Sequence, residues 1–357
     1  MPTALRPSLP NCPAPDHMVS LAFAGAGWIT PMHAMAAKAL GIDVRAFASR
    51  TVEHADAKAR EFGGRAVAYD QLPAGADVVV VATPPSRHVV DALHALAAGA
   101  AVLVEKPLAT TLADADRLVA ADIDGRVAYA ENLVHSPAVQ AMLGRLGLIG
   151  APSYIEIRMV GPRPSYGEFL TPEWGGGALF DLGAHPLALA LLFGGSATVT
   201  RVMATVEGGT DHLSDEAATV TLLFDSGLRA SVVVSWRGQL APIWDAQISG
   251  SDGVLRAELL PTVSVEHNGV PVALPPSRYS PTQLEELGYL GQLRGFVADR
   301  AANRRPVLDA AFGRLVLDVV CAARDHGAQY RYAGKTLRAS WLPDSLFWTA
   351  KIGRAHV

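Results

Sequence analysis

Short apolar runs alternate with helical patterns through the first half of the chain. This alternation is typical of βαβ units, in which parallel strands are joined by helices. The segment 77–82 (DVVVVA) is apolar after its first residue, as expected for a strand that is covered on both faces. The predicted strands are residues 19–24, 43–48, 66–69, 77–82, 101–104 and 127–130, and the predicted helices begin near residues 30, 51, 87 and 111.

The pattern changes after about residue 137, where apolar and polar positions begin to alternate one by one. This predicts antiparallel strands at 153–160, 217–224 and 228–236, the last two joined by a tight turn. Two helical patterns follow, one over 280–300 that Ser280 and Pro281 would open, and one over 309–327.

The predicted fold class is α/β with two domains. Residues 18–136 are expected to form a Rossmann domain, a doubly wound parallel sheet. Residues 137–340 are expected to form an α+β domain with an open, mainly antiparallel sheet.

The two ends of the chain do not fit this pattern. Residues 1–17 hold five prolines and lack the apolar segment of a secretory signal, so we interpret them as a disordered leader. Residues 351–357 (KIGRAHV) match the in-frame translation of a common sequencing adapter, and we interpret them as a non-native tail.

Composition narrows the class of protein. The chain has 357 residues, of which 50% are apolar and 18% charged, as expected for a globular protein of about two domains. The net charge is −4 without a block of like charges, so neither nucleic acid nor an anionic membrane is an expected partner. No apolar stretch reaches the ~18 residues of a membrane span. The two cysteines, Cys12 and Cys321, make no disulfide framework, which favours the cytoplasm.

A glycine motif follows the first predicted strand. Gly25 and Gly27 allow a tight turn and close approach of a pyrophosphate to the start of the next helix, so we predict that they bind a dinucleotide together with Trp28 and Ile29. The alternative is an ordinary glycine turn, since Thr30 stands where the motif prefers Gly or Ala.

The end of the second strand discriminates between dinucleotides. An acidic residue there would accept a hydrogen bond from the ribose 2′-hydroxyl of NAD, whereas a basic one suits the 2′-phosphate of NADP. The chain carries Ser49 and Arg50, so NADP is the favoured cofactor and NAD the alternative. Arg50 could also be a surface residue that stacks on adenine, which is compatible with either cofactor.

Two further strands end in candidate cofactor contacts. Thr83, Pro84 and His88 follow the fourth strand at the edge where open α/β sheets bind ligands, although a turn is the simpler role of the prolines. Glu105 and Lys106 follow the fifth. A lysine directly after a buried strand is expected to have a lowered pKa, useful for acid/base work, and a cis bond to Pro107 would turn it into the cleft. The alternative is a surface lysine.

The segment 175–185 (GGGALFDLGAH) is the densest candidate site. Asp181 and His185 are four residues apart, so on one helix they would share a face and could hold a substrate hydroxyl between them. The three glycines would let the backbone approach a ligand. No third ligand is spaced to complete a zinc site, so no metal is expected. The alternative is a capping Asp beside a core His.

Seven motifs of the chain, taken in order, resemble those of the Gfo/Idh/MocA oxidoreductase family. They are G-A-G-W-I-T, A-S-R-T, A-T-P-P-S-R-H, V-E-K-P-L, A-E-N, I-G-A-P and G-G-G-A-L-F-D-L-G-A-H. That family includes glucose–fructose oxidoreductase and inositol dehydrogenases. The resemblance spans about residues 19–334. It implies a Rossmann domain and a second domain that binds substrate and whose open sheet often mediates oligomerisation, so a homodimer or homotetramer is expected.

The resemblance also implies roles for individual residues. Lys106 looks like the family's catalytic lysine, and Asp181 and His185 look like its substrate-binding and acid/base pair. Glu131 and Asn132 match a family segment at the boundary of cofactor and substrate, and Asn132 is expected to contact the cofactor.

The function implied is hydride transfer between a nicotinamide and a hydroxyl-bearing carbon of a sugar, a polyol or a related small molecule. His185 would accept the hydroxyl proton beside Lys106, or the two would exchange roles. Pro186 stands where many sugar- and inositol-oxidising members carry Asp, which puts a polyol contact in doubt. The alternatives are a dinucleotide-binding sensor without turnover and a trans-dihydrodiol or biliverdin-type reductase.

Overall fold

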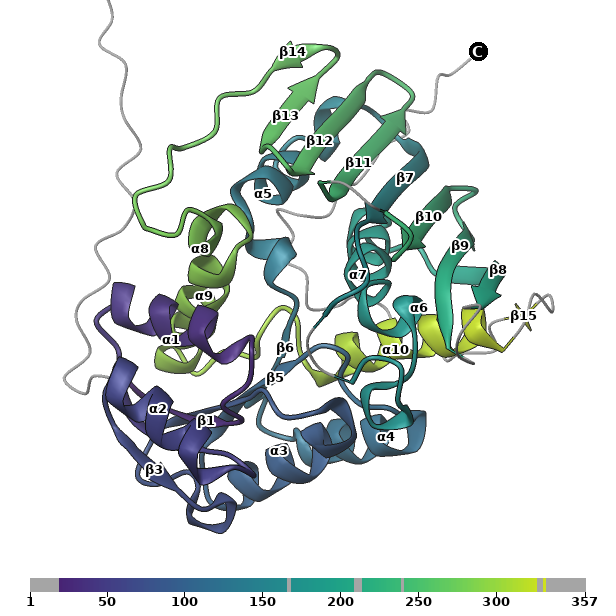
Figure 1. Cartoon of the computed structure of the whole chain (residues 1–357). Helices are drawn as coiled ribbons and strands as arrows, with labels where there is room; N and C mark the ends of the chain where they lie inside the picture. Colours follow the sequence, from purple (N-terminus) through teal and green to yellow (C-terminus); the bar gives the residue numbers. More distant parts are fainter. Residues whose placement is uncertain (1–18, 166–167, 209–213, 239–240, 326–329, 332–357) are drawn as a thin grey trace, which may run out of the picture.

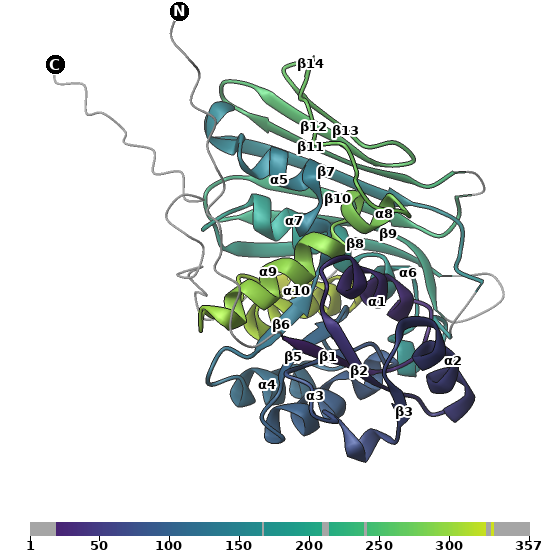
Figure 2. The same cartoon turned by 90° about the vertical axis from the view of Figure 1, so that its left-hand side faces the viewer.

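The computed structural model describes residues 19–165, 168–208, 214–238, 241–325 and 330–331 (Figure 1). The expected leader at 1–17 and tail at 351–357 lie outside these residues. Two sheets, one from each half of the chain, organise the described part (Figures 1 and 2).

The first sheet is parallel and has six strands in the order β3-β2-β1-β4-β5-β6. This confirms the predicted doubly wound class. Its strands are β1 (Ser20–Ala24), β2 (Asp43–Ala48), β3 (Arg65–Val67), β4 (Val78–Val81), β5 (Ala101–Glu105) and β6 (Val127–Ala130). The connecting helices are α1 (Thr30–Ala39), α2 (Val52–Phe62), α3 (His88–Ala97) and α4 (Leu112–Ala121), with short turns η1 (Tyr69–Gln71) and η2 (Pro85–Arg87).

Alternate strand residues enter two hydrophobic layers, which is why the central strands are apolar throughout. Leu21 and Phe23 of β1 pack with α1 and α2, whereas Ala22 and Ala24 pack with α3 and α4. All four residues of β4 are buried. Both faces of the sheet are therefore covered, as expected for a parallel sheet.

The second sheet has nine strands in the order β14-β13-β12-β11-β7-β10-β9-β8-β15. The β7–β10 pair is parallel and the other pairs are antiparallel, which confirms the predicted mainly antiparallel sheet. Its strands are β7 (Pro152–Val160), β8 (Val199–Gly208), β9 (Asp215–Phe224), β10 (Arg229–Ser235), β11 (Ile243–Gly250), β12 (Val254–Leu260), β13 (Ser264–His267), β14 (Val270–Pro271) and β15 (Tyr330–Arg331).

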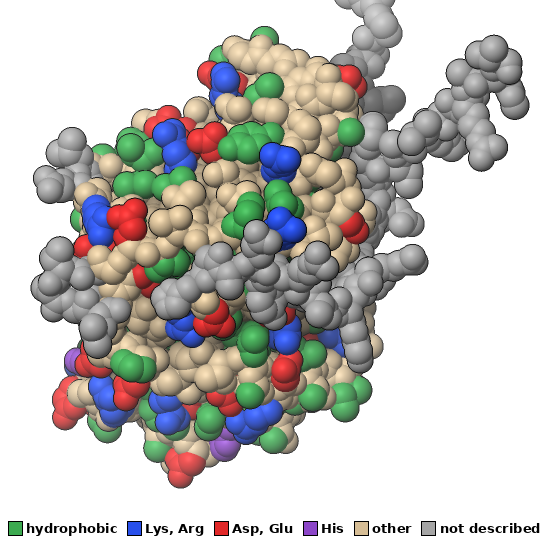
Figure 3. Space-filling view, turned by 90° about the vertical axis from the view of Figure 1, so that its right-hand side faces the viewer, with side chains coloured by type: hydrophobic (Ala, Val, Ile, Leu, Met, Phe, Trp, Pro, Cys, Tyr) green, Lys and Arg blue, Asp and Glu red, His purple; other side chains and the backbone are tan. Residues whose placement is uncertain are grey.

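Among the described residues, helices cover only one face of this sheet. In β10, Ala230, Val232 and Val234 are buried and alternate with more exposed residues, so the strand has one inner and one outer face. The inner face packs against α7, whose residues are all buried. On the outer side, apolar, basic and acidic side chains are interspersed (Figure 3).

The helices of the second half are η3 (Asn132–His135), α5 (Pro137–Leu143), η4 (Leu146–Leu148), η5 (Pro172–Trp174), α6 (Ala178–Asp181), α7 (Ala184–Phe193), α8 (Gln283–Glu286), α9 (Tyr289–Ala301) and α10 (Ala310–Arg324). The prediction of one helix over 280–300 is wrong. Gly288 has φ 84°, which an α-helix cannot continue through, and the chain forms α8 and α9 instead. Helices α9 and α10 return to pack against α1 and α4. In the described residues no helix is both long and apolar enough to cross a bilayer.

Candidate active site

Two ion pairs meet at the carboxyl end of the parallel sheet, and each joins the two halves of the chain. Lys106 directly follows β5 and Glu131 directly follows β6. Their partners come from the second half: Asp181 ends α6, and His185 lies in the first turn of α7. The site therefore exists only because α6 and α7 dock against the end of the Rossmann sheet.

The Lys106 ammonium is held by one residue. Its Nζ donates to Oδ1 of Asp181 at 2.7 Å and to the Asp181 carbonyl at 2.9 Å. Burial opposes a charged ammonium, but nearby carboxylates, chiefly that of Asp181, outweigh it and raise the pKa of Lys106 above its usual value. The expected fall in pKa is therefore wrong. The bond to Pro107 is cis.

The His185 imidazole is held by a carboxylate that water does not reach. Nδ1 of His185 lies 2.8 Å from Oε1 and 3.0 Å from Oε2 of Glu131. The Glu131 side chain is 0% exposed and that of His185 is 8% exposed. Motif matching placed Glu131 near the site but did not pair it with His185, which lies 54 positions further along the chain.

Asp181 and His185 do not share a helix, contrary to the prediction. The helical turn ends at Asp181, and a second helix starts at Ala184. A Cβ on Gly183 would lie 2.3 Å from the Leu179 carbonyl oxygen, so this position admits no side chain in the observed conformation. The break directs Asp181 to Lys106 and His185 to Glu131.

Two of the three glycines before α6 serve the protein's own packing. A Cβ on Gly175 would lie 1.9 Å from the Phe180 ring, and one on Gly177 would lie 2.1 Å from Oδ2 of Asp215. Asp215 also accepts a hydrogen bond from the Leu179 backbone at 2.7 Å. These contacts within the protein explain Gly175 and Gly177 without the expected approach of a ligand to the backbone.

The two glycines of the turn after β1 have different surroundings: Gly25 is tightly packed and Gly27 is open. A Cβ on Gly25 would lie 2.3 Å from the Ala82 carbonyl oxygen, whereas one on Gly27 would meet nothing within 4 Å. Trp28 is 61% exposed beside it. Thr30 does not cap the helix, because Ile29 is the N-cap residue and Thr30 Oγ1 donates to the Gly25 carbonyl at 3.1 Å. The open backbone at Gly27 fits a pyrophosphate at the start of α1.

Arg50 lies at the surface after β2, next to the start of η1. Ser49 accepts a hydrogen bond from the Thr51 backbone at 3.3 Å. Burial is the main cause that raises the pKa of Tyr69, and the Arg50 backbone and guanidinium oppose it, which places Arg50 beside the Tyr69 phenol. The Arg87 guanidinium lies 5.1 Å from the centre of the Tyr69 ring. Two cationic side chains thus flank Tyr69 at this edge.

His88 ties two loops of the carboxyl edge together. Its Nδ1 lies 2.8 Å from the Pro107 carbonyl oxygen and its Nε2 lies 2.8 Å from that of Thr83, the residue before Pro84. Burial lowers the pKa of His88. We therefore expect His88 to shape the cofactor site rather than to contact the cofactor. The Asn132 side-chain amide likewise makes a contact within the protein, since its Nδ2 donates a hydrogen bond to the Leu287 carbonyl oxygen at 2.7 Å.

The sequence prediction missed a second buried histidine–carboxylate pair. Nε2 of His33, on α1, lies 2.6 Å from Oε1 of Glu105, and the other carboxylate oxygen accepts from the Lys106 backbone at 3.1 Å. Burial would raise the pKa of Glu105, but His33, together with the charge of Lys106, lowers it below its usual value. Neither spacing nor a motif linked these residues, which are 72 positions apart.

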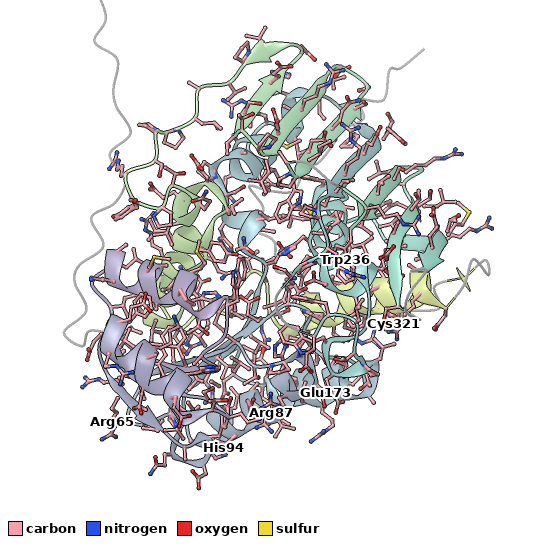
Figure 4. The ribbon with its side chains drawn as sticks, viewed as in Figure 1. Arg65, Arg87, His94, Glu173, Trp236 and Cys321 are labelled. Carbon is pink, nitrogen blue, oxygen red and sulfur yellow. The ribbon has the colours of Figure 1, made fainter. Side chains whose placement is uncertain are left out.

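Aromatic side chains of the second half contact His185 and one another. The Trp244 ring, on β11, is centred 6.0 Å from the His185 ring at an angle of 37°. Phe169 contacts Trp174 and Trp236 edge-on. The η2 and η5 turns are in contact, and Arg87 and Glu173 lie close together in Figure 4. Across the described residues there is no group of three His, Cys, Asp or Glu side chains that could hold a metal.

Two family models match most of the described chain. "Oxidoreductase family, NAD-binding Rossmann fold" matches residues 19–131, and "GFO/IDH/MocA C-terminal domain" matches residues 140–256.

Curated relatives and solved structures agree with these matches. The chain is 34% identical to dTDP-3,4-didehydro-2,6-dideoxy-alpha-D-glucose 3-reductase of Streptomyces violaceoruber, over 54% of this chain and 61% of the reductase, less than two thirds of that enzyme's length. It is 28% identical to D-xylose 1-dehydrogenase (NADP+) of Haloarcula marismortui, over 69% of this chain and 73% of the enzyme. The crystal structure of GenD2 from gentamicin A biosynthesis in complex with NAD superposes with a TM-score of 0.78 at 23% identity, over 90% of this chain and 97% of that one.

Proposed function

The chain belongs to the Gfo/Idh/MocA oxidoreductase family, and we propose that it is an NADP-preferring dehydrogenase or reductase of a hydroxyl-bearing carbon in a sugar or polyol. The observation that carries this proposal is the meeting of the Lys106–Asp181 and His185–Glu131 pairs at the carboxyl end of the Rossmann sheet. A sensor without turnover would need no such proton-transfer groups, so the pairs favour an enzyme. The two relatives named above act on sugars by name.

The chain's own residues would bind and orient the reactants. Gly27 would admit the pyrophosphate at the start of α1, Gly25 would keep the turn packed against Ala82, and Arg50 would hold the 2′-phosphate with Ser49. A bound nicotinamide supplies the hydride chemistry. Lys106 stays charged and would donate a hydrogen bond to the substrate oxygen, while a side chain beside it moves the hydroxyl proton.

The test of the function is a turnover assay. The purified protein would be incubated with NADP or NADPH and a panel of sugars, polyols, keto-sugars and nucleotide-linked sugars, and the absorbance of reduced nicotinamide would be followed. We expect turnover in one of these classes. No turnover in any class, by a folded protein that binds NADPH, would favour the sensor; turnover of aromatic diols alone would favour the dihydrodiol reductase.

We expect Arg50→Ala to weaken NADPH binding by about 10- to 100-fold, because a phosphate loses a charge-assisted, two-pronged partner. NADH binding should change little, since NADH has no 2′-phosphate. A fluorescence titration of both cofactors against both proteins measures the difference. Arg45→Ala, an exposed arginine on β2, is the matched control. Equal losses for NADH and NADPH would mean that Arg50 acts on adenine instead.

We also propose that two or more copies associate through the outer face of the nine-stranded sheet. No helix of the described residues covers this face, and Tyr154 and Ile243 on it are 38% and 46% exposed. Sedimentation velocity tests this, because a monomer at micromolar concentration would contradict it.

A cytoplasmic location is proposed from the low cysteine count and is tested by cell fractionation.

A further inference from the structure

Glu131 is a buried carboxylate that has no catalytic role so far in the proposed mechanism. Its side chain has no exposed area, and in the described part of the chain both of its oxygens lie within hydrogen-bonding distance of one atom, Nδ1 of His185. An ionised carboxylate without a partner is costly to bury, so the pairing with His185 compensates for its burial.

The pairing decides which nitrogen of His185 carries a proton. An ionised Glu131 can only accept hydrogen bonds, so it selects the tautomer with the proton on Nδ1. The neutral ring then presents an unprotonated Nε2 on the opposite side, and an isolated lone pair of this kind is what a general base needs.

Two neighbouring titratable groups, Lys106 and Tyr129, keep one protonation state. The carboxylates around Lys106, Asp181 first among them, raise its pKa, so it remains an ammonium. Burial, with smaller contributions from Glu131 and Glu105, raises the pKa of Tyr129 well above its usual value, so it remains a neutral phenol. From β11, the neighbour of His185 is the uncharged Trp244 ring.

We infer that Glu131 is a positioning residue that makes His185 the proton acceptor and Lys106 the hydrogen-bond donor. The inference rests on the proposed function. In the oxidising direction the substrate O–H and C–H bonds break and a carbonyl forms. The proton goes to Nε2 of His185, and the electron pair leaves as hydride to the nicotinamide dinucleotide. Glu131, 2.8 Å from Nδ1, balances the charge of the resulting imidazolium.

The kinetic test is Glu131→Gln, which keeps an oxygen to accept from Nδ1 but removes the charge. We expect kcat to fall by about 100-fold, and the acid limb of kcat to move to lower pH by about one unit, because the imidazolium loses its counter-charge. NADPH binding should be unchanged. Glu61→Gln near the end of α2 makes the same chemical change at an exposed side chain of the first half and serves as the control. A wild-type kcat and pH profile for Glu131→Gln would overturn the inference.

A second measurement does not depend on turnover. In ¹⁵N NMR spectra of the wild-type protein, the neutral His185 ring is expected to carry its proton on Nδ1. The chain has 11 histidines, and the signal that His185→Gln removes identifies the right one. A proton on Nε2 would overturn the inference even in an active enzyme. The Nδ1 tautomer in a protein that turns over no sugar would retain the pairing and reject the proposed function instead.

Discussion

Replacing Lys106 with methionine is expected to lower kcat by about 10²- to 10³-fold, which is the usual effect of removing a donor aimed at a charge that develops in the transition state. Methionine keeps the length and apolar body of the side chain but removes the ammonium that contacts Asp181 at 2.7 Å. NADPH affinity should be nearly unchanged, because the change removes a contact to the substrate oxygen and none to the phosphates.

Steady-state kinetics and a fluorescence titration on the same preparation separate these two effects. Lys38→Met is the matched control, since Lys38 is an exposed lysine in the last turn of α1. If Lys106→Met keeps full activity, the lysine is structural and the proposed mechanism is wrong. If it loses NADPH binding and activity together, Lys106 belongs to the cofactor site.

The sequence predicted those features that depend on neighbours along the chain. The apolar run of β4 and the glycine turn after β1 each place a strand and its end, and a series of such units makes a parallel sheet. The residues at the ends of β2 and β5 could therefore be identified as candidates before any side-chain contact was known.

The pairings could not be predicted, because they join distant parts of the chain. His33 meets Glu105 across 72 positions, and His185 meets Glu131 across 54. Helical spacing connected Asp181 with His185 instead, since four residues on one helix share a face. The chain breaks between them, and each residue finds its partner at the end of a different Rossmann strand.

The pKa of Lys106 also differs from the prediction. An apolar strand before a lysine indicates desolvation, which lowers a lysine pKa. The sequence could not show that Asp181 would bind the ammonium through both a carboxylate and a carbonyl oxygen. In the proposed mechanism Lys106 is therefore a donor that stays charged, and His185 is the acid/base group.

The second large effect is expected for Gly177→Ala, which should lower the free energy of unfolding by about 3 kcal/mol or more. Gly177 has φ 118°, and an added Cβ would lie 2.1 Å from Oδ2 of Asp215. Backbone strain costs about 1–3 kcal/mol, and a displaced buried carboxylate loses its hydrogen bond from Leu179 for about 1–3 kcal/mol more. Calorimetry should show a Tm at least about 4 °C below that of the native chain.

The same substitution should reach the chemistry through α6. Asp215 holds the first turn of this helix, and Asp181 at its last residue holds Lys106. A displaced Asp215 therefore releases the lysine, and kcat should fall even at temperatures where Gly177→Ala is folded. Gly195→Ala is the matched control, because Gly195 has φ 63° and a Cβ there would meet nothing within 4 Å. It carries backbone strain without the clash, so equal losses in Tm for the two variants would show that the contact with Asp215 contributes nothing.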